Sequence, residues 1–167
     1  MTLTATEIAQ DQDEAMAEHL RQTGAHILLV QDLLMAVSRA LLARSLHHDE
    51  SKLEPPEAEM FAKALALLKG STYGSDGYRA ALRSIKPALQ HYYEHNRHHP
   101  EFWGRGIRDM NLVDLIEMVC DWYAAAKRHD DGDFGRSLEI NRERFGIPDD
   151  LIAIIANTED MMQEATA

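Results

Sequence analysis

The sequence predicts an all-α protein, a compact single-domain helical bundle of about six to seven helices. Two observations predict this class. Apolar residues recur at steps of three, four and seven along most of the chain, which is the spacing of one helix face. No stretch shows the alternation of apolar and polar residues that is typical of a β-strand. The chain has 167 residues, the length of one domain. We therefore expect one domain over residues 1–167, with its core at about 12–158 and loose termini.

The first long helical segment covers about residues 12–46 and is expected to form one or two helices, with a break near Gly24 or around 38–44. Its apolar stripe consists of Leu20, Ile27, Val30, Leu34, Val37 and Leu41. The sequence "EPPE" interrupts the helical pattern, because proline lacks the amide proton that a helix interior needs. Another helix follows and ends at Gly70.

The second half of the chain also has a helical pattern. A helix over about 77–98 contains Pro87, which should kink or restart it. The segment "NLVDLIEMVCDWYAAAKRH" is the clearest helix in the sequence. The residues expected to face the core from it are Leu112, Leu115, Val119 and Trp122. A helix over about 134–145 comes next, and "GIPDD" begins the last one with a proline in its first turn.

Composition and charge exclude several classes of partner. The net charge of −11 repels polyanions, whereas proteins that bind nucleic-acid polymers usually present a basic face. No run approaches the ~18 apolar residues of a membrane span, and the N-terminus does not resemble a signal peptide. The single cysteine, Cys120, excludes an internal disulfide and is expected to pack in the core. We expect a cytoplasmic protein that binds no nucleic-acid polymer and no membrane. A small phosphorylated substrate is compatible with the net charge where a few cations are local. A homodimer is compatible with these features.

Four of the nine histidines lie within nine residues, in and just before "EHNRHHPEFW". On a helix, with 100° per residue, His91, His95 and His98 would share one face and could direct their imidazoles at one point. His99 would lie further round, next to Pro100. The alternative is a solvated polar stripe near a helix end, where protonated histidine favours the helix dipole.

A second candidate is "SLHHDESKL", which contains His48 and Asp49 side by side and Lys52 three residues later. Adjacent histidine and aspartate can ligate one cation where the backbone turns at a helix end. The pair alone is a weak signal. The sequence "RHDDGD" contains another, His129–Asp130, which we interpret as a helix end that leads into a solvated turn.

Two further residues complete the set of candidates. His26 lies beside the first apolar stripe, where a single histidine is more often a hydrogen-bonded core residue than a ligand. Asp121 lies among apolar residues in "EMVCDWYAA" and needs a partner, because unpaired burial of a charge costs several kcal/mol. That partner is an arginine or a metal ion; otherwise Asp121 lies on a wet face with Asp114 and Glu117.

The order of these residues resembles the HD-domain superfamily of metal-dependent phosphohydrolases, whose pattern is H…HD…D, with two further histidines in its two-metal members. "HDESK" is similar to the HDxxK form of the motif, and "HDxSK", "NRHHPEFW" and "EMVCDW" together resemble a small family within or near this superfamily. The resemblance covers about residues 20–158, but the doubled histidine at 98–99 departs from the pattern and leaves the extra ligands ambiguous. The metal ligands that it implies are His26, His48, Asp49, His91, His98 and Asp121.

The resemblance implies an HD-like helical bundle and a phosphohydrolase that acts on a small phosphoester, above all a nucleotide or deoxynucleotide. Histidine and carboxylate ligands suit one or two divalent transition ions, Mn²⁺, Fe²⁺, Co²⁺, Ni²⁺ or Zn²⁺. The expected catalytic residues are Asp49, Lys52 and Glu57, and the expected substrate contacts are Lys52, Arg97 and Trp103. Two other functions stay open: a mixed-valent diiron oxygenase of the same superfamily, and a non-catalytic protein that binds a metal or another ligand.

Overall fold

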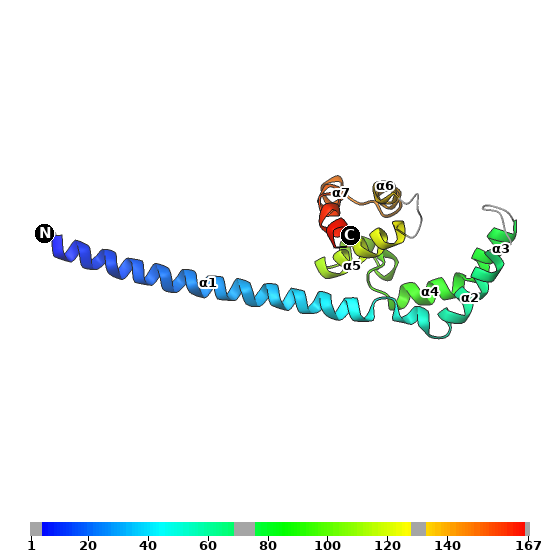
Figure 1. Cartoon of the computed structure of the whole chain (residues 1–167), viewed down its shortest axis with the longest axis horizontal. Helices are drawn as coiled ribbons and strands as arrows, with labels where there is room; N and C mark the ends of the chain where they lie inside the picture. Colours follow the sequence, from blue (N-terminus) through cyan, green and yellow to red (C-terminus); the bar gives the residue numbers. More distant parts are fainter. Residues whose placement is uncertain (1–4, 69–75, 128–132, 166–167) are drawn as a thin grey trace. The chain divides into compact units, whose positions relative to one another are not determined.

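A computed structural model describes residues 5–68, 76–127 and 133–165 (Figure 1). Within these residues all regular structure is helical, so the all-α prediction is confirmed. The α-helices are α1 Ala5–His47, α2 Glu57–Leu68, α3 Asp76–Ser84, α4 Lys86–His95, α5 Leu112–Ala126, α6 Phe134–Phe145, α7 Asp149–Ala156 and α8 Glu159–Glu164. The short 3₁₀ helices are η1 Glu50–Leu53, η2 Pro100–Phe102 and η3 Gly106–Asp109. The count exceeds the predicted six to seven because two of the predicted helices are each divided in two.

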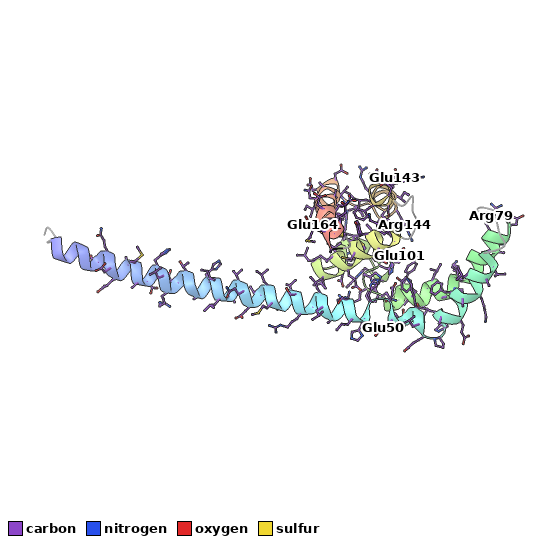
Figure 2. All side chains as sticks on the ribbon, viewed as in Figure 1. Glu50, Arg79, Glu101, Glu143, Arg144 and Glu164 are labelled. Atoms are coloured by element: carbon purple, nitrogen blue, oxygen red, sulfur yellow. The ribbon has the colours of Figure 1, made fainter. Side chains whose placement is uncertain are left out.

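The chain forms two units, Met1–Ala43 and Arg44–Ala167. The first unit is the greater part of α1, which continues through Gly24 without the expected break. Most of its apolar stripe is exposed, with 62% of both Leu20 and Leu34 accessible to solvent. Figure 2 shows side chains projecting on all sides of α1. A single helix has no second element against which to bury such a stripe, so the stripe is not a core within this unit.

By length and composition alone, α1 is a candidate membrane span. The sequence did not predict this, because charged and polar residues interrupt its apolar runs. Mostly buried core helices of soluble proteins and signal sequences also meet this criterion, and none of this apolar window is buried within the structure. Asp32 and Arg39 lie within its apolar stretch. A charged side chain at the centre of a bilayer costs ~2.5–3.5 kcal/mol. The absence of a membrane partner therefore stays our prediction.

The core of the second unit lies around α5, where α6, α7 and α8 pack against it (Figure 1). Its buried members are Met118, Val119, Trp122, Tyr123, Phe134, Leu138, Ile147, Ile155 and Met162. The predicted core positions Val119 and Trp122 are buried, but the prediction for Leu112 is wrong, because this first residue of α5 is 74% exposed. Cys120 is also exposed rather than part of the core.

A break between α3 and α4 determines where the histidine-rich segment lies. Pro87 is in the first turn of α4 and restarts the helix after Ser84, as expected. However, α4 ends at His95, and Asn96 is extended with φ −118° and ψ 97°. The predicted helical face shared by residues 91 to 98 is therefore wrong, since His98 follows the helix instead of lying on it.

Candidate metal centre

The His48–Asp49 pair lies at a sharp turn just after α1. Asp49 adopts a left-handed conformation with φ 58° and ψ 17°, and η1 begins at the next residue. This conformation costs most residues about 1–2 kcal/mol and is better tolerated by aspartate. Two bonds hold the carboxylate: the Tyr92 hydroxyl donates to Oδ1 at 2.6 Å and Lys52 Nζ donates to Oδ2 at 2.6 Å.

His98 and His99 reach the same place from the segment between α4 and η2. The His98 side chain is 2% exposed, and its Nε2 lies 3.5 Å from Asp49 Oδ1. Its ring centroid lies 4.6 Å from that of His48. His99 Nε2 lies 2.5 Å from the Tyr92 hydroxyl oxygen. The extended chain after α4 thus directs two consecutive imidazoles into one site.

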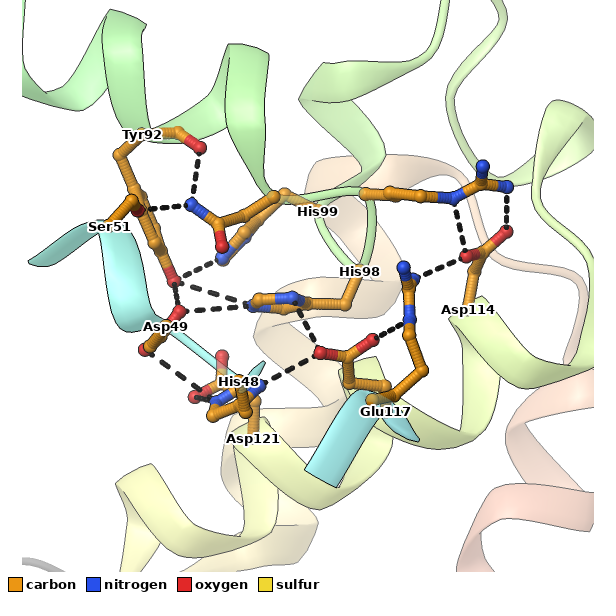
Figure 3. A network of polar contacts seen from close by, with 12 residues as sticks. His48, Asp49, Ser51, Tyr92, His98, His99, Asp114, Glu117 and Asp121 are labelled. Atoms are coloured by element: carbon orange, nitrogen blue, oxygen red, sulfur yellow. Dashed lines mark hydrogen bonds and ion pairs between the residues drawn. The ribbon is translucent and has the colours of Figure 1, made fainter. Parts of the chain in front are cut away.

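The last acidic member comes from α5. Asp121 Oδ1 lies 3.7 Å from His48 Nε2, whose other carboxylate neighbour is Asp49 Oδ2 at 3.6 Å. The five side chains form two overlapping groups, and within each group one ligand atom per residue lies within 4.8 Å of the others. The groups are His48, Asp49 and His98, and His98, His99 and Asp121 (Figure 3).

Glu117, one turn before Asp121 on α5, orients both imidazoles. Its Oε1 accepts from His48 Nδ1 at 3.0 Å and from His98 Nδ1 at 3.2 Å (Figure 3). The Nε2 atoms of both rings are then left to face the carboxylates of the cluster. A carboxylate that holds the second ring nitrogen is typical of histidines that ligate metals, because it selects the tautomer and orients the ring.

A row of alternating charges lies behind Glu117. Arg44 Nε donates to Glu117 Oε2 at 2.7 Å, and a second nitrogen of the same guanidinium donates to Asp114 Oδ1 at 2.6 Å. Asp114 is 1% exposed and also accepts from Arg97 Nε at 3.1 Å and from the Asn111 backbone amide at 3.1 Å. The buried carboxylate is therefore paired, and it is also part of the capping box that begins α5.

The cluster holds its acids ionised. Burial opposes the ionisation of Asp121 and of Glu117, but hydrogen bonds and nearby positive charges together outweigh it and lower the pKa of each. The hydrogen bond to Asp121 comes from His48, and those to Glu117 come from His48 and His98. Asp121 and then Glu117 raise the pKa of His48 to about 10. Burial lowers the pKa of His99 to about 4, so that its imidazole is neutral at pH 7.

The hydrogen bonds of His48 and His98 determine which of their nitrogen atoms can hold an ion. Because the Nδ1 atoms of His48 and His98 donate to Glu117, their Nε2 lone pairs are available once His48 loses its proton. With Asp49 and Asp121 they make two imidazole nitrogens and two carboxylates, a set that suits divalent transition metals. Both groups contain His98, and one imidazole nitrogen binds one ion. The described residues thus fit a mononuclear centre.

Two predicted site residues of the second unit, Glu57 and His91, contact each other. Glu57 is completely buried and accepts from His91 Nδ1 at 2.7 Å and from Ser51 Oγ at 3.0 Å. Neither Glu57 nor His91 belongs to the two groups of the cluster. His26 lies in the first unit and is exposed. The pair His129–Asp130 lies outside the described residues.

The expected substrate residues Arg97 and Trp103 contact each other. The Arg97 guanidinium lies 4.8 Å from the Trp103 ring, and Trp103 Nε1 donates to the Arg97 carbonyl at 2.8 Å. Because Arg97 is also bound to Asp114, it supports the capping box of α5. Lys52, which is also expected to bind phosphate, contacts the cluster directly, because its Nζ donates to Asp49.

Sequence reasoning missed two residues that organise the site, Glu117 and Tyr92. In the sequence, Glu117 enters only through the wet-face alternative for Asp121, although its spacing from Asp121 places both carboxylates on one side of α5. No motif in the sequence singles out Tyr92. Its hydroxyl could not be located from sequence, because the chain turns between it and the histidines that follow.

A comparison with family models matches residues 15–165 of the chain to the family of unknown function DUF5662. The chain belongs to this family. The match covers every residue of the cluster as well as Glu117 and Tyr92. Neither the curated proteins nor the solved structures gave a match to the chain.

Proposed function

We propose that this DUF5662 protein is a metal-dependent phosphohydrolase that acts on a small phosphoester, above all a nucleotide or deoxynucleotide. The observation that carries the proposal is Glu117, which holds two imidazoles so that their free nitrogens face Asp49 and Asp121. Five side chains gathered from three separate stretches of sequence are difficult to explain as a solvated surface. The resemblance to the HD-domain superfamily supports the same chemistry.

A divalent ion at this site would polarise a phosphoryl oxygen and lower the pKa of a bound water toward ~7. The protein contributes orientation and charge. Lys52 Nζ lies 2.6 Å from Asp49 Oδ2 and 4.2 Å from the centroid of the Tyr92 ring, and its side chain is 37% exposed. A partly exposed ammonium next to the cluster can bind a phosphate oxygen, which the net charge of −11 would otherwise repel.

The other two functions are less well supported. A diiron oxygenase needs ligands for two ions, whereas the two groups of the described cluster share His98. A non-catalytic metal protein would not need Lys52 beside the ligands, and it would bind metal without turnover. Metal content, oxygen consumption and phosphoester hydrolysis therefore separate the three functions.

The test starts with full-length protein purified without a histidine tag. Metal content is measured by mass spectrometry, and hydrolysis of 5′-nucleotides, deoxynucleotides and p-nitrophenyl phosphate is followed before and after treatment with a chelator. His48→Ala is compared with His47→Ala, a matched control from the preceding position. The His47 side chain is 69% exposed and contacts Glu50 rather than the cluster.

We expect metal-dependent phosphate release by the wild-type protein and the His47 variant, and at least a hundredfold loss in the His48 variant. Oxygen consumption with iron bound would replace the proposal by the oxygenase. A metal-loaded protein that hydrolyses none of these phosphoesters would indicate a binding protein. A protein that binds no divalent ion would overturn the metal centre itself.

A further inference from the structure

The hydroxyl of Tyr92 lies in the middle of the candidate metal centre. Tyr92 is 4% exposed, and its oxygen lies 2.6 Å from Asp49 Oδ1, 2.5 Å from His99 Nε2 and 3.4 Å from His98 Nε2 (Figure 3). One buried hydroxyl thus contacts three members of the cluster. A tyrosine that only filled space would not need such partners, and the phosphohydrolase proposal assigns Tyr92 no role.

The partners of the Tyr92 hydroxyl determine which group donates each hydrogen. A phenol has one hydrogen to donate, and the ionised carboxylate of Asp49 can only accept. The hydroxyl hydrogen of Tyr92 is therefore donated to Asp49 Oδ1, and the two oxygens are 2.6 Å apart. The close contact with His99 then requires His99 Nε2 to carry a hydrogen and donate it to the phenol oxygen.

The two adjacent histidines differ in which ring nitrogen carries a hydrogen. His98 Nδ1 donates to Glu117, which leaves the Nε2 of His98 with a free lone pair. His99 uses its Nε2 hydrogen on Tyr92, so this nitrogen has no lone pair for a metal. Of the two Nε2 atoms, that of His98 therefore has the free lone pair, whereas the lone pair of the neutral His99 ring is on Nδ1.

We propose that Tyr92 is a positioning residue of the metal centre: its hydroxyl orients Asp49 and engages His99, so that His98 is the metal ligand of the pair. This inference rests on the proposed metal centre. It assigns His99 to the Tyr92–Asp49 chain of hydrogen bonds, although His99 belongs to one of the two groups that could hold an ion.

Tyr92→Phe is a suitable test because it removes only the oxygen. The ring contacts can persist, with Lys52 Nζ 4.2 Å and Phe61 6.4 Å from the ring, and Lys52 still binds Asp49. Loss of an outer-shell partner typically weakens metal binding by about 10–100-fold. His99 acts one bond further from the metal than Tyr92, so its removal should weaken binding less than about tenfold.

The experiment titrates Co²⁺ into the full-length apoprotein by chelator competition and records the visible d–d spectrum. The variants are Tyr92→Phe, His98→Ala, His99→Ala, His99→Gln and the double variant Tyr92→Phe/His99→Ala, each with a thermal melt to confirm folding. A glutamine amide can still donate to the phenol oxygen, so it tests rescue.

We expect Tyr92→Phe to bind Co²⁺ about 10–100-fold more weakly with a changed spectrum. His98→Ala should lose binding. His99→Ala should keep most of it, His99→Gln should be closer to wild type, and the double variant should be no weaker than Tyr92→Phe, because the two residues act in one chain.

Two results would overturn the inference: a Tyr92→Phe protein with wild-type affinity and spectrum, or a His99→Ala protein that loses Co²⁺ as completely as His98→Ala. If a variant at position 92 does not fold, the comparison of the two histidines decides. A wild-type protein that binds no Co²⁺ would overturn the metal centre and this inference together. Normal binding with an unaffected Tyr92 variant would overturn this inference alone.

Discussion

Glu117→Gln tests the arrangement that makes the cluster a metal centre. The substitution keeps the size of the side chain but removes its charge and replaces one acceptor oxygen by an amide that donates. Glu117 accepts two imidazole hydrogens on Oε1 and an Arg44 hydrogen on Oε2, so a glutamine must turn its amide group toward a donor. Whichever way it turns, at least one donor loses its acceptor.

The size of the effect follows from these contacts. A hydrogen bond to a charged group contributes about 1.5–3 kcal/mol, and part of this energy orients each ring for the metal. A loss of about 1.4–2.8 kcal/mol in metal binding corresponds to a 10–100-fold higher Kd. We expect Glu117→Gln to fall in this range, with less effect on the fold, since Arg44 keeps its bond to Asp114.

A second effect works in the opposite direction. Glu117 is one of the three carboxylates that raise the pKa of His48 to about 10, with Asp121 and Asp49, so its removal makes the proton easier for a metal to displace. This advantage of the variant decreases as the pH rises toward that pKa, because the wild-type imidazole then loses its own proton. The ratio of the Kd values of the variant and the wild type should therefore increase with pH.

The assay is chelator-buffered Zn²⁺ titration at pH 6.5, 7.5 and 8.5. Glu139→Gln is the control, because it breaks a surface ion pair with Arg142 on α6 that lies outside the cluster. It should leave the Kd unchanged. A Glu117→Gln protein that binds Zn²⁺ within about twofold of wild type at every pH would refute the orienting role of this carboxylate.

Three further predictions concern the ligands, the protons and the local fold. Asp121→Ala should lower the bound metal to a small fraction of wild type, whereas the exposed Asp150→Ala should not; equal metal content in both would remove Asp121 from the ligand set. Because the folded pKa of His48 is raised to about 10, its contribution to apoprotein stability is fully present below ~6.5 and is lost as the pH rises through about 10. At pH 7.5 an ion must displace this proton, so calorimetry in two buffers should show about one proton released per ion, and no release would contradict the assignment. Asn111→Ala removes the side chain that caps α5, and urea unfolding should show a loss of about 1 kcal/mol; an unchanged midpoint would contradict this.

The sequence alone determined the helical class and most helix positions. Apolar spacing predicted the helix over residues 134 to 145, and Pro87 marked the restart of α4, because both signals act within a few residues. The resemblance of the sequence to the HD-domain superfamily implied six metal ligands, and four of them, His48, Asp49, His98 and Asp121, lie in the two groups of the cluster. The residue types alone left a solvated helix end open as the alternative.

Only the tertiary structure decided how these residues meet. The end of α4 at His95 removed His98 from the helical face, and His91 found Glu57 instead of the cluster. The sequence records neighbours along the chain, whereas the roles of Glu117 and Tyr92 depend on contacts with residues up to 73 positions away. Hydrogen bonds at such separations are set by how the helices pack, and a periodic pattern in one segment contains no information about the partner that another segment will supply.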